Sequence, residues 1–132
     1  MMARHHGTKV TIMIGSNTGD RKSHIDNAVE ALREYVGGIT VTHDIDNPDF
    51  TGVGPDYLNR LLSGTTVLPL ERLKTIVKAI ETRLGRDRRD PAIVVIDIDI
   101  VVYDDNIIKP SEYTSPPCRR LLPALNAGHR ST

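Results

Sequence analysis

A run of β-branched residues from Ala92 to Tyr103 constrains the fold of this chain more than any other segment. It contains eight Val and Ile residues and is bounded by Pro91 on one side and by Asp104, Asp105 and Asn106 on the other. β-Branched residues favour extended backbone, and Pro, Asp and Asn are typical of strand ends. We therefore predict a strand over residues 92–103.

Two acidic residues, Asp97 and Asp99, interrupt this apolar run. Successive side chains of a strand point to opposite faces, so the two aspartates share one face. The other face carries Ile96, Ile98 and Ile100. Placing two carboxylates in an apolar strand is costly unless their charge is compensated, and Mg²⁺ can compensate it while keeping positions open for phosphate oxygens. The alternative is a solvated face, or aspartates paired with arginine, and the spacing alone leaves both interpretations open.

The composition limits the function classes. The chain has 17 basic and 17 acidic residues and a formal net charge of zero, whereas general nucleic-acid and membrane-surface binders are more often clearly basic. No apolar run is long enough to span a membrane, and the N-terminus lacks a signal-peptide core. The single cysteine, Cys118, excludes an internal disulfide and agrees with a reducing compartment. We expect a cytoplasmic protein that binds neither nucleic acid nor membranes. The sequence does not indicate its oligomeric state.

The 132 residues are expected to form one domain, 1–132, with a disordered leader over 1–8 and an irregular, proline-rich tail over 111–132. Between these lie alternating strand and helix patterns. The expected elements are strands 9–14, 39–45, 57–68 and 92–103, helices 21–35 and 70–84, and a long loop over 46–56. The order β-α-β-β-α-β predicts an α+β, ferredoxin-like fold, an antiparallel sheet with two helices on one face. The first and last strands would then be central neighbours, which would place Asp97 and Asp99 in the middle of the sheet, near the turn Gly15–Asn17 or the long loop.

Four short motifs, in the same order and at similar spacing, resemble those of a known protein family. They are Ile14-Gly15-Ser16-Asn17, Pro55-Asp56-Tyr57-Leu58-Asn59, Ile80-Glu81 through Gly85-Arg86, and Ile96-Asp97-Ile98-Asp99-Ile100. Over residues 9–110 the chain resembles the 6-hydroxymethyl-7,8-dihydropterin pyrophosphokinases. This implies Mg²⁺-dependent transfer of pyrophosphate from ATP to the hydroxymethyl group of 6-hydroxymethyl-7,8-dihydropterin, a step of folate biosynthesis. Such transfer depends mainly on positioning and charge neutralisation.

The resemblance also implies site residues. Asp97 and Asp99 would hold two Mg²⁺ ions, with Arg86 and Arg88 near the triphosphate. Tyr57 would pack against the pterin and Asn59 would bond its edge, and the loop residues Asp46, Asn47, Pro48 and Asp49 would complete that pocket. The remaining ATP contacts would be Lys78, Glu81, Arg88, Ile100 and Thr114. Ser16 and Asn17 are expected to support the site.

Several of these residues also have a purely structural interpretation. Tyr57 could be a packed aromatic at the sheet rim, and Glu81 could serve only as an ion-pair partner of Arg88 or Lys78. Gly15–Asn17 could be no more than a turn.

Two segments depart from the family pattern. Residues 89–95 stand where the family has a tryptophan and a Gly-Pro-Arg-Thr segment, and Val94 aligns with its arginine. Residues 115–123 lack the family's histidine and its pterin-stacking phenylalanine. The cations that could substitute are Arg88, Arg89, Arg119 and Arg120. A second hypothesis is therefore a ferredoxin-like module that binds a nucleotide, a pterin or a partner protein without catalysis.

Overall fold

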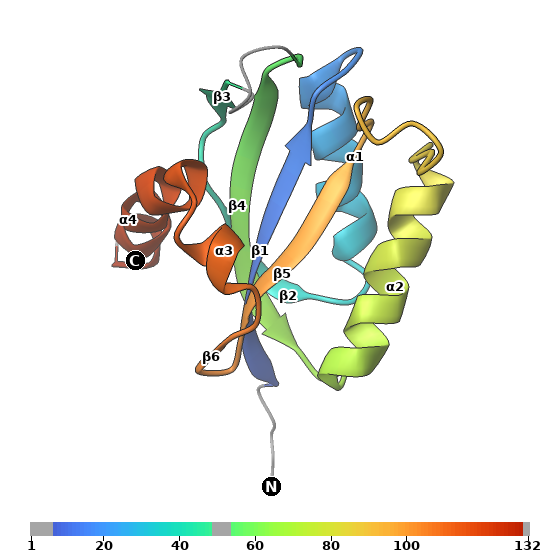
Figure 1. Ribbon diagram of the computed structural model, residues 1–132. Coiled ribbons are helices and arrows are strands. Elements are labelled where there is room, and N and C mark those ends of the chain that lie inside the picture. Colours follow the sequence, from blue (N-terminus) through green and yellow to red (C-terminus); the bar gives the residue numbers. More distant parts are fainter. Residues whose placement is uncertain (1–6, 49–53, 131–132) are drawn as a thin grey trace, which may run out of the picture.

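An antiparallel sheet forms the centre of the protein and carries helices on both faces (Figure 1). The computed structural model describes residues 7–48 and 54–130. Within these residues the strand order is β2-β4-β1-β5-β6, and β3 also pairs with β4. In chain order the elements are β1 (Thr8–Ser16), α1 (Arg21–Leu32), β2 (Gly37–Val41), β3 (Ile45–Asn47), β4 (Tyr57–Thr66), α2 (Leu70–Arg83), β5 (Asp97–Tyr103), β6 (Asn106–Ile107), α3 (Pro110–Tyr113) and α4 (Pro116–Arg130).

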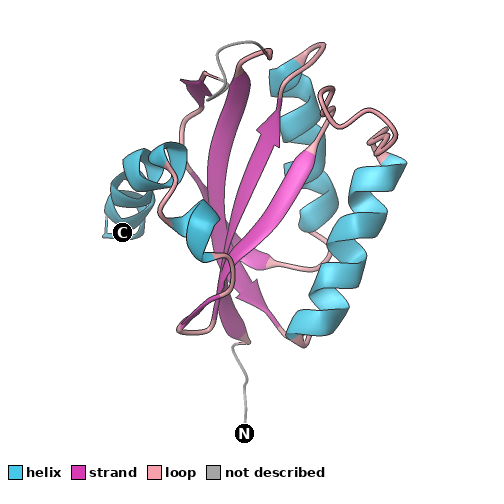
Figure 2. Ribbon diagram, in the orientation of Figure 1, coloured by secondary structure: helices cyan, strands magenta, loops and turns pink. Residues whose placement is uncertain are grey.

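The predicted α+β, ferredoxin-like arrangement is confirmed. β1 pairs antiparallel with β4 on one side and with β5 on the other, so the first and last long strands are neighbours. α1 and α2 lie side by side on one face of this sheet (Figure 2). None of the helices within the described ranges has the length and apolar character needed to cross a membrane.

Helical spacing explains why α1 and α2 pack on this face, because residues three or four positions apart share one side of a helix. The buried residues of the two helices and of the strands beneath them form one cluster. It includes Ile25, Val29 and Leu32 of α1, Leu73, Val77 and Ile80 of α2, and Ile12, Ile14, Ile98 and Ile100 of the sheet. Each fully buried side chain of this kind stabilises the fold by about 1.5–3 kcal/mol. The isoleucines of β5 therefore face the helices, and its aspartates face the other side.

The prediction of an irregular tail over 111–132 is wrong for the residues that the structure describes. α3 and α4 cover the second face of the sheet, where Cys118, Leu121 and Leu125 pack against Met13 and Val101. Burial raises the pKa of the Cys118 thiol to about 11, so this thiol is an uncharged part of that core.

The prolines misled the sequence analysis. Pro110 and Pro116 lie at the first positions of α3 and α4, where the missing N–H would have had no partner inside the helix. Pro123 lies inside α4. Residues 131–132 lie outside the described residues.

Several strand boundaries also differ from the prediction. β5 begins at Asp97 and not at residue 92, because Val94 and Ile96 are buried in a turn-rich approach to the strand. The predicted strand 39–45 is divided into β2 and β3, and its two ends pack on opposite faces of the sheet. Thr8 is already part of β1, and residues 1–6 of the predicted leader lie outside the described residues.

Gly64 lies within β4 at a close approach between neighbouring strands. A Cβ added there would lie 2.6 Å from the Gly37 carbonyl oxygen and 2.6 Å from Val36 Cγ1. Backbone cannot yield as a flexible side chain can, so this site requires a residue without a side chain.

We expect Gly64→Ala to lower the free energy of unfolding by about 1–3 kcal/mol, because β2 and β4 must move apart. The midpoint of urea denaturation at an unchanged m value measures this. Gly37→Ala is the matched control, since a Cβ at Gly37 meets no atom within 4 Å. Equal losses in the two variants would contradict the steric explanation.

Candidate active site

Two cavities meet at the start of β5, and Asp97 and Asp99 line both of them. The first has a volume of about 460 Å³ and lies between α2, β5 and the segment around Lys109. The second has a volume of about 650 Å³ and lies over β1 and β4, beneath the start of α4. A ligand in either cavity would therefore be bounded by the same pair of carboxylates.

Both aspartates have cationic partners. Arg86 Nη1 lies 3.2 Å from Asp97 Oδ1, and Lys109 Nζ lies 2.5 Å from Asp99 Oδ1. The Asp99 side chain is 10% exposed and the Asp97 side chain 34%. Burial, and then the charge of Asp99, raises the pKa of Asp97 to about 7, so the two cations compensate the pair only in part.

Carboxylate oxygens in this arrangement suit a hard divalent cation. Within the described residues there is no group of three or more His, Cys, Asp or Glu side chains that could hold a metal. A cation at Asp97 and Asp99 would therefore take its other ligands from substrate or water, which is the usual mode for Mg²⁺.

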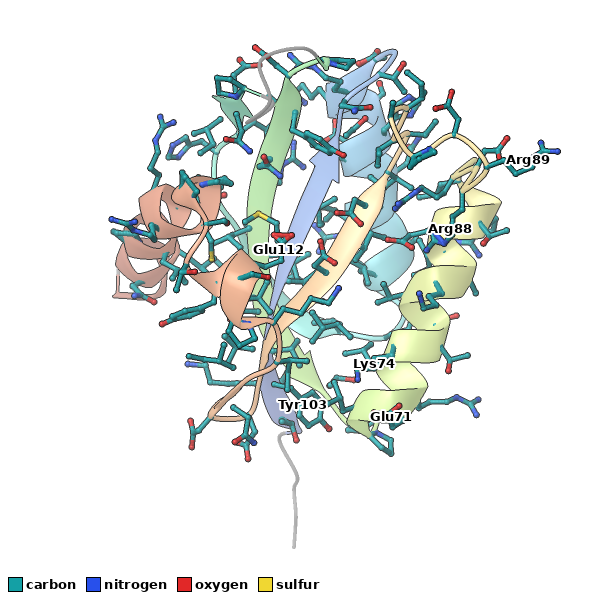
Figure 3. The ribbon with its side chains drawn as sticks, viewed as in Figure 1. Glu71, Lys74, Arg88, Arg89, Tyr103 and Glu112 are labelled. Atoms are coloured by element: carbon teal, nitrogen blue, oxygen red, sulfur yellow. The ribbon has the colours of Figure 1, made fainter. Side chains whose placement is uncertain are left out.

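The first cavity is lined by more cationic than anionic side chains. Its cations come from α2, from the loop after it and from the segment after β6: Lys74, Lys78, Arg86, Arg88 and Lys109. Figure 3 shows Lys74 near the beginning of α2 and Arg88 beyond the end of that helix. These cations lie among the carboxylates Glu81, Asp97 and Asp99. Such a mixed lining suits a polyphosphate with a bound metal ion, because the cations can contact phosphate oxygens and the carboxylates can contact the metal.

Glu81 organises one wall of this cavity. Its side chain is 4% exposed, and its carboxylate accepts from the Ile98 N–H at 2.7 Å and from Arg88 Nη2 at 2.5 Å. Arg86 is held as well, because its Nη1 also donates to the Ile96 carbonyl at 3.1 Å. Of the two structural partners suggested for Glu81, the structure shows Arg88.

The second cavity contains an unpaired acceptor. Asn59 is 7% exposed, and within the described residues its buried Oδ1 has no hydrogen-bond partner. Its amide lies over Gly15, where an added Cβ would be 2.7 Å from Asn59 Nδ2 and 3.4 Å from Tyr57 Cδ2. A buried polar atom without a partner is costly, so Asn59 Oδ1 is a natural contact for a ligand N–H.

Asn17, which follows β1, fastens the segment that leads into β5. Its side chain donates to the Ala92 carbonyl at 2.9 Å and accepts from the Val94 N–H at 2.7 Å. Its own N–H donates to the Val94 carbonyl at 2.9 Å. These bonds give Asn17 a supporting part in the site.

The structure brings most of the predicted site residues together around the two cavities. The first cavity contains Lys78, Glu81, Arg86, Arg88 and Ile100, and the second contains Asn47, Pro48, Tyr57, Asn59 and Thr114. Thr114 was predicted to contact ATP, but it lines the second cavity, whereas the other predicted ATP contacts line the first. Arg89, Arg119 and Arg120 line neither of these two cavities.

Of the predicted pterin contacts that the structure describes, Asp46 is not among the lining residues. Asp46 is 65% exposed at its side chain and pairs with Arg21 at 3.0 Å, outside both cavities. Arg21 also donates to the Asp56 carbonyl, so it bridges the first and last residues of the predicted loop. Asp49 lies outside the described residues.

Three charged lining residues were missed by the sequence analysis: Lys74, Lys109 and Glu112. Lys74 could have been found, because it lies four positions before Lys78 on one helix and therefore on the same face. Glu112 belongs to the tail 111–132 that was predicted to be irregular, and Lys109 lies between the last predicted strand and that tail, so no periodic pattern indicated either residue. Glu112 extends from α3 toward the middle of the sheet (Figure 3), and burial, followed by the charge of Asp99, raises its pKa.

Comparison with known proteins decides the family. A sequence model of the 7,8-dihydro-6-hydroxymethylpterin-pyrophosphokinase (HPPK) family matches residues 11–130. The chain belongs to the HPPK family. It is 34% identical over 105 residues to the 2-amino-4-hydroxy-6-hydroxymethyldihydropteridine pyrophosphokinase of Aquifex aeolicus (strain VF5), an alignment that covers 76% of this chain and 64% of that protein.

A longer plant protein is also similar to this HPPK-family chain. The "Folate synthesis bifunctional protein" of Arabidopsis thaliana is 30% identical over 118 residues, covering 79% of this chain and 24% of the plant protein. The chain thus spans less than two thirds of the bacterial relative and about a quarter of the plant relative.

The raised pKa of Asp97 predicts a pH-dependent stability for this HPPK-family chain. The folded-state pKa of about 7 lies above the ordinary value of 3.8, so the folded state holds a proton that the unfolded state has lost. Stability should therefore fall as pH rises from about 4 to about 7 and then level off. We expect Asp97→Asn to be more stable than wild type at pH 8, without divalent ions, by about 1–2 kcal/mol after solvent screening.

Urea denaturation at pH 8, 6 and 4 measures this difference, which should shrink toward pH 4. Asp105→Asn, in the exposed turn after β5, is the control and should leave the pH profile unchanged. A wild-type protein that matches Asp97→Asn at pH 8 would contradict the raised pKa of Asp97.

Proposed function

We propose that this chain transfers pyrophosphate from ATP to the hydroxymethyl group of 6-hydroxymethyl-7,8-dihydropterin in the presence of Mg²⁺. One observation carries the proposal: Asp97 and Asp99 are shared by a basic cavity and by a cavity that contains an unpaired amide acceptor. A nucleotide in the first and a pterin in the second would meet at these carboxylates.

The nucleotide is assigned to the first cavity because that cavity contains cationic side chains and, in the part of the chain that the structure describes, an unpaired side of strand β5. Lys74, Lys78 and Arg88 provide positive charge for the phosphates. β6 pairs only with Val102 and Tyr103, so the part of β5 around Ile100 has no strand on that side within the described residues. Backbone groups there, together with the apolar side chains of Val77 and Ile108, suit a flat heterocyclic base.

The pterin is assigned to the second cavity because of Asn59. Its Oδ1 would accept an N–H of the pterin edge and would thereby satisfy the one buried side-chain oxygen or nitrogen that lacks a partner within the described residues. Tyr57 lies beside Asn59 over Gly15 and offers an aromatic face. Asn47 and Pro48 close the cavity on the side of β3.

Asp97 and Asp99 would hold Mg²⁺, which when bound neutralises the triphosphate charge. Arg86 holds Asp97 in place, and Glu81 holds Arg88 beside the phosphates. The hydroxymethyl oxygen would form a bond to the β-phosphorus, and the bond from that phosphorus to the α,β-bridging oxygen would break. AMP would leave with that bonding electron pair, and the hydroxyl proton would pass to solvent.

The test is release of AMP from ATP that requires both 6-hydroxymethyl-7,8-dihydropterin and Mg²⁺. We expect Asp99→Asn to lower kcat/KM by about 10³-fold or more, because a ligand of the Mg²⁺ that would neutralise the transferring group is lost. Asp105→Asn should retain wild-type rates. AMP release that is independent of the pterin would contradict the proposed acceptor.

Asn59→Leu is expected to affect one substrate and not the other. Losing a hydrogen bond to a buried acceptor should raise KM for the pterin by about tenfold while leaving KM for ATP within about twofold. Steady-state rates with each substrate varied in turn measure the two constants. Equal changes in both KM values would count against a pterin in the second cavity.

The second candidate is a binding module without catalysis. Val94, which aligns with an arginine of the family pattern, is 3% exposed and is held by Asn17, so no cation reaches the site from that position. Binding of both ligands without AMP release, even at saturating concentrations, would favour this function.

A further inference from the structure

Lys109 differs from the other cations of the first cavity in what it contacts. Its Nζ lies 2.5 Å from Asp99 Oδ1, and Asp99 is its one salt-bridge partner within the described residues. Arg86 is bonded both to Asp97 and to the Ile96 carbonyl, and Lys74 lies 3.3 Å from Glu71 on its own helix. Lys109 is therefore the cation that neutralises a carboxylate at the junction of the two cavities through a single contact.

The main chain of Lys109 is fixed, but its side chain has room to move. The Lys109 carbonyl accepts from the Tyr113 N–H at 2.9 Å, so the residue is held at the start of α3. Its side chain is 48% exposed and lines the first cavity, whereas the Asp99 side chain is 10% exposed. A lysine is a point charge on a flexible four-carbon stem, so it can change partners without movement of the backbone.

Asp99 Oδ1 cannot contact an ammonium group at 2.5 Å and a metal ion at full strength at the same time, because the two cations would repel each other. A metal ion that takes Asp99 Oδ1 as its ligand would therefore displace Lys109 from that oxygen. The displaced ammonium group stays tethered beside the cavity, whose other side carries the cations Lys74, Lys78 and Arg88. The nearest favourable partner for it would be a phosphate oxygen of a bound nucleotide.

We propose that Lys109 is an exchangeable counter-ion, bound to Asp99 in the ligand-free protein and transferred to a phosphate of the nucleotide when Asp99 binds a divalent metal. This rests on the proposed function of the site. Lys109 then competes with metal alone but assists the metal–nucleotide complex. The two ligands therefore strengthen each other's binding, and the site favours metal-bound nucleotide over free metal.

The experiment titrates the full chain with Mn²⁺ alone, followed by the paramagnetic resonance of the free ion. A second titration, in excess Mn²⁺, uses an ATP analogue with a methylene group in place of the α,β-bridging oxygen. We expect Lys109→Met to bind Mn²⁺ alone about fivefold more tightly and to bind the analogue about tenfold more weakly. Opposite changes in the two titrations are the signature of an exchanged partner.

Lys74→Met is the matched control, because Lys74 lines the same cavity without contacting Asp97 or Asp99. Lys74→Met should weaken binding of the ATP analogue and leave Mn²⁺ binding unchanged. Lys109→Arg keeps the charge and should bind the analogue within about threefold of wild type. Circular dichroism checks that each variant is folded, and Lys109→Gln replaces Lys109→Met if that variant is not.

Two outcomes would overturn the inference alone: Mn²⁺ binding to Lys109→Met that is no tighter than in wild type, or analogue binding that is unchanged. In both cases a wild-type protein that binds Mn²⁺ and the analogue, and an Asp97→Asn, Asp99→Asn double variant that binds no Mn²⁺, would leave the proposed function standing. A wild-type protein that binds neither ligand would overturn both.

Discussion

The placement of two carboxylates, Asp97 and Asp99, side by side where burial and mutual repulsion both disfavour their charge is the constraint on which the rest of the site depends. Both carboxylates belong to a strand whose opposite side packs into the main core, so neither can turn away without breaking the alternation of β5. Two cations compensate the carboxylates in part: Arg86 pairs with Asp97, and Lys109 pairs with Asp99. The pKa of Asp97 remains raised in spite of these ion pairs. Incomplete compensation of buried charge in the ligand-free protein is typical of sites where a bound ligand supplies the remaining opposite charge.

The neighbouring strand determines how this charge is presented. Gly15 of β1 is opposite Asn59 of β4 and opposite Asp97 of β5, so a residue without a side chain separates the amide from the carboxylate. Two positions further along, Asn17 holds the approach to β5 through three hydrogen bonds. The segment Gly15–Asn17, at the end of β1, thus acts on both neighbouring strands: it leaves space over the sheet and fixes the start of the acidic strand.

Sequence patterns predicted the parts of this structure that depend on local periodicity. The helical spacing of Ile25, Val29 and Leu32 and the alternation around Asp97 and Asp99 both indicate the face that each side chain takes. The C-terminal helices escaped prediction because Pro116 at the first position of α4 looks like a helix breaker. The contact of Lys109 with Asp99 depends on the turn between β5 and β6, and the unpaired Asn59 oxygen depends on strand register. Neither has a periodic signal in the chain.

The short length of β6 has a consequence for association. A strand whose backbone groups are unpaired along one side can add a strand from another copy, which is a common route to aggregation. β6 covers only the last two residues of β5, yet the Glu81 carboxylate already occupies the Ile98 N–H, and charged side chains surround the rest of that side. An incoming strand would have to remove water from these charges. The acidic and basic residues assigned to ligand binding therefore also keep this sheet from extending into a neighbouring molecule.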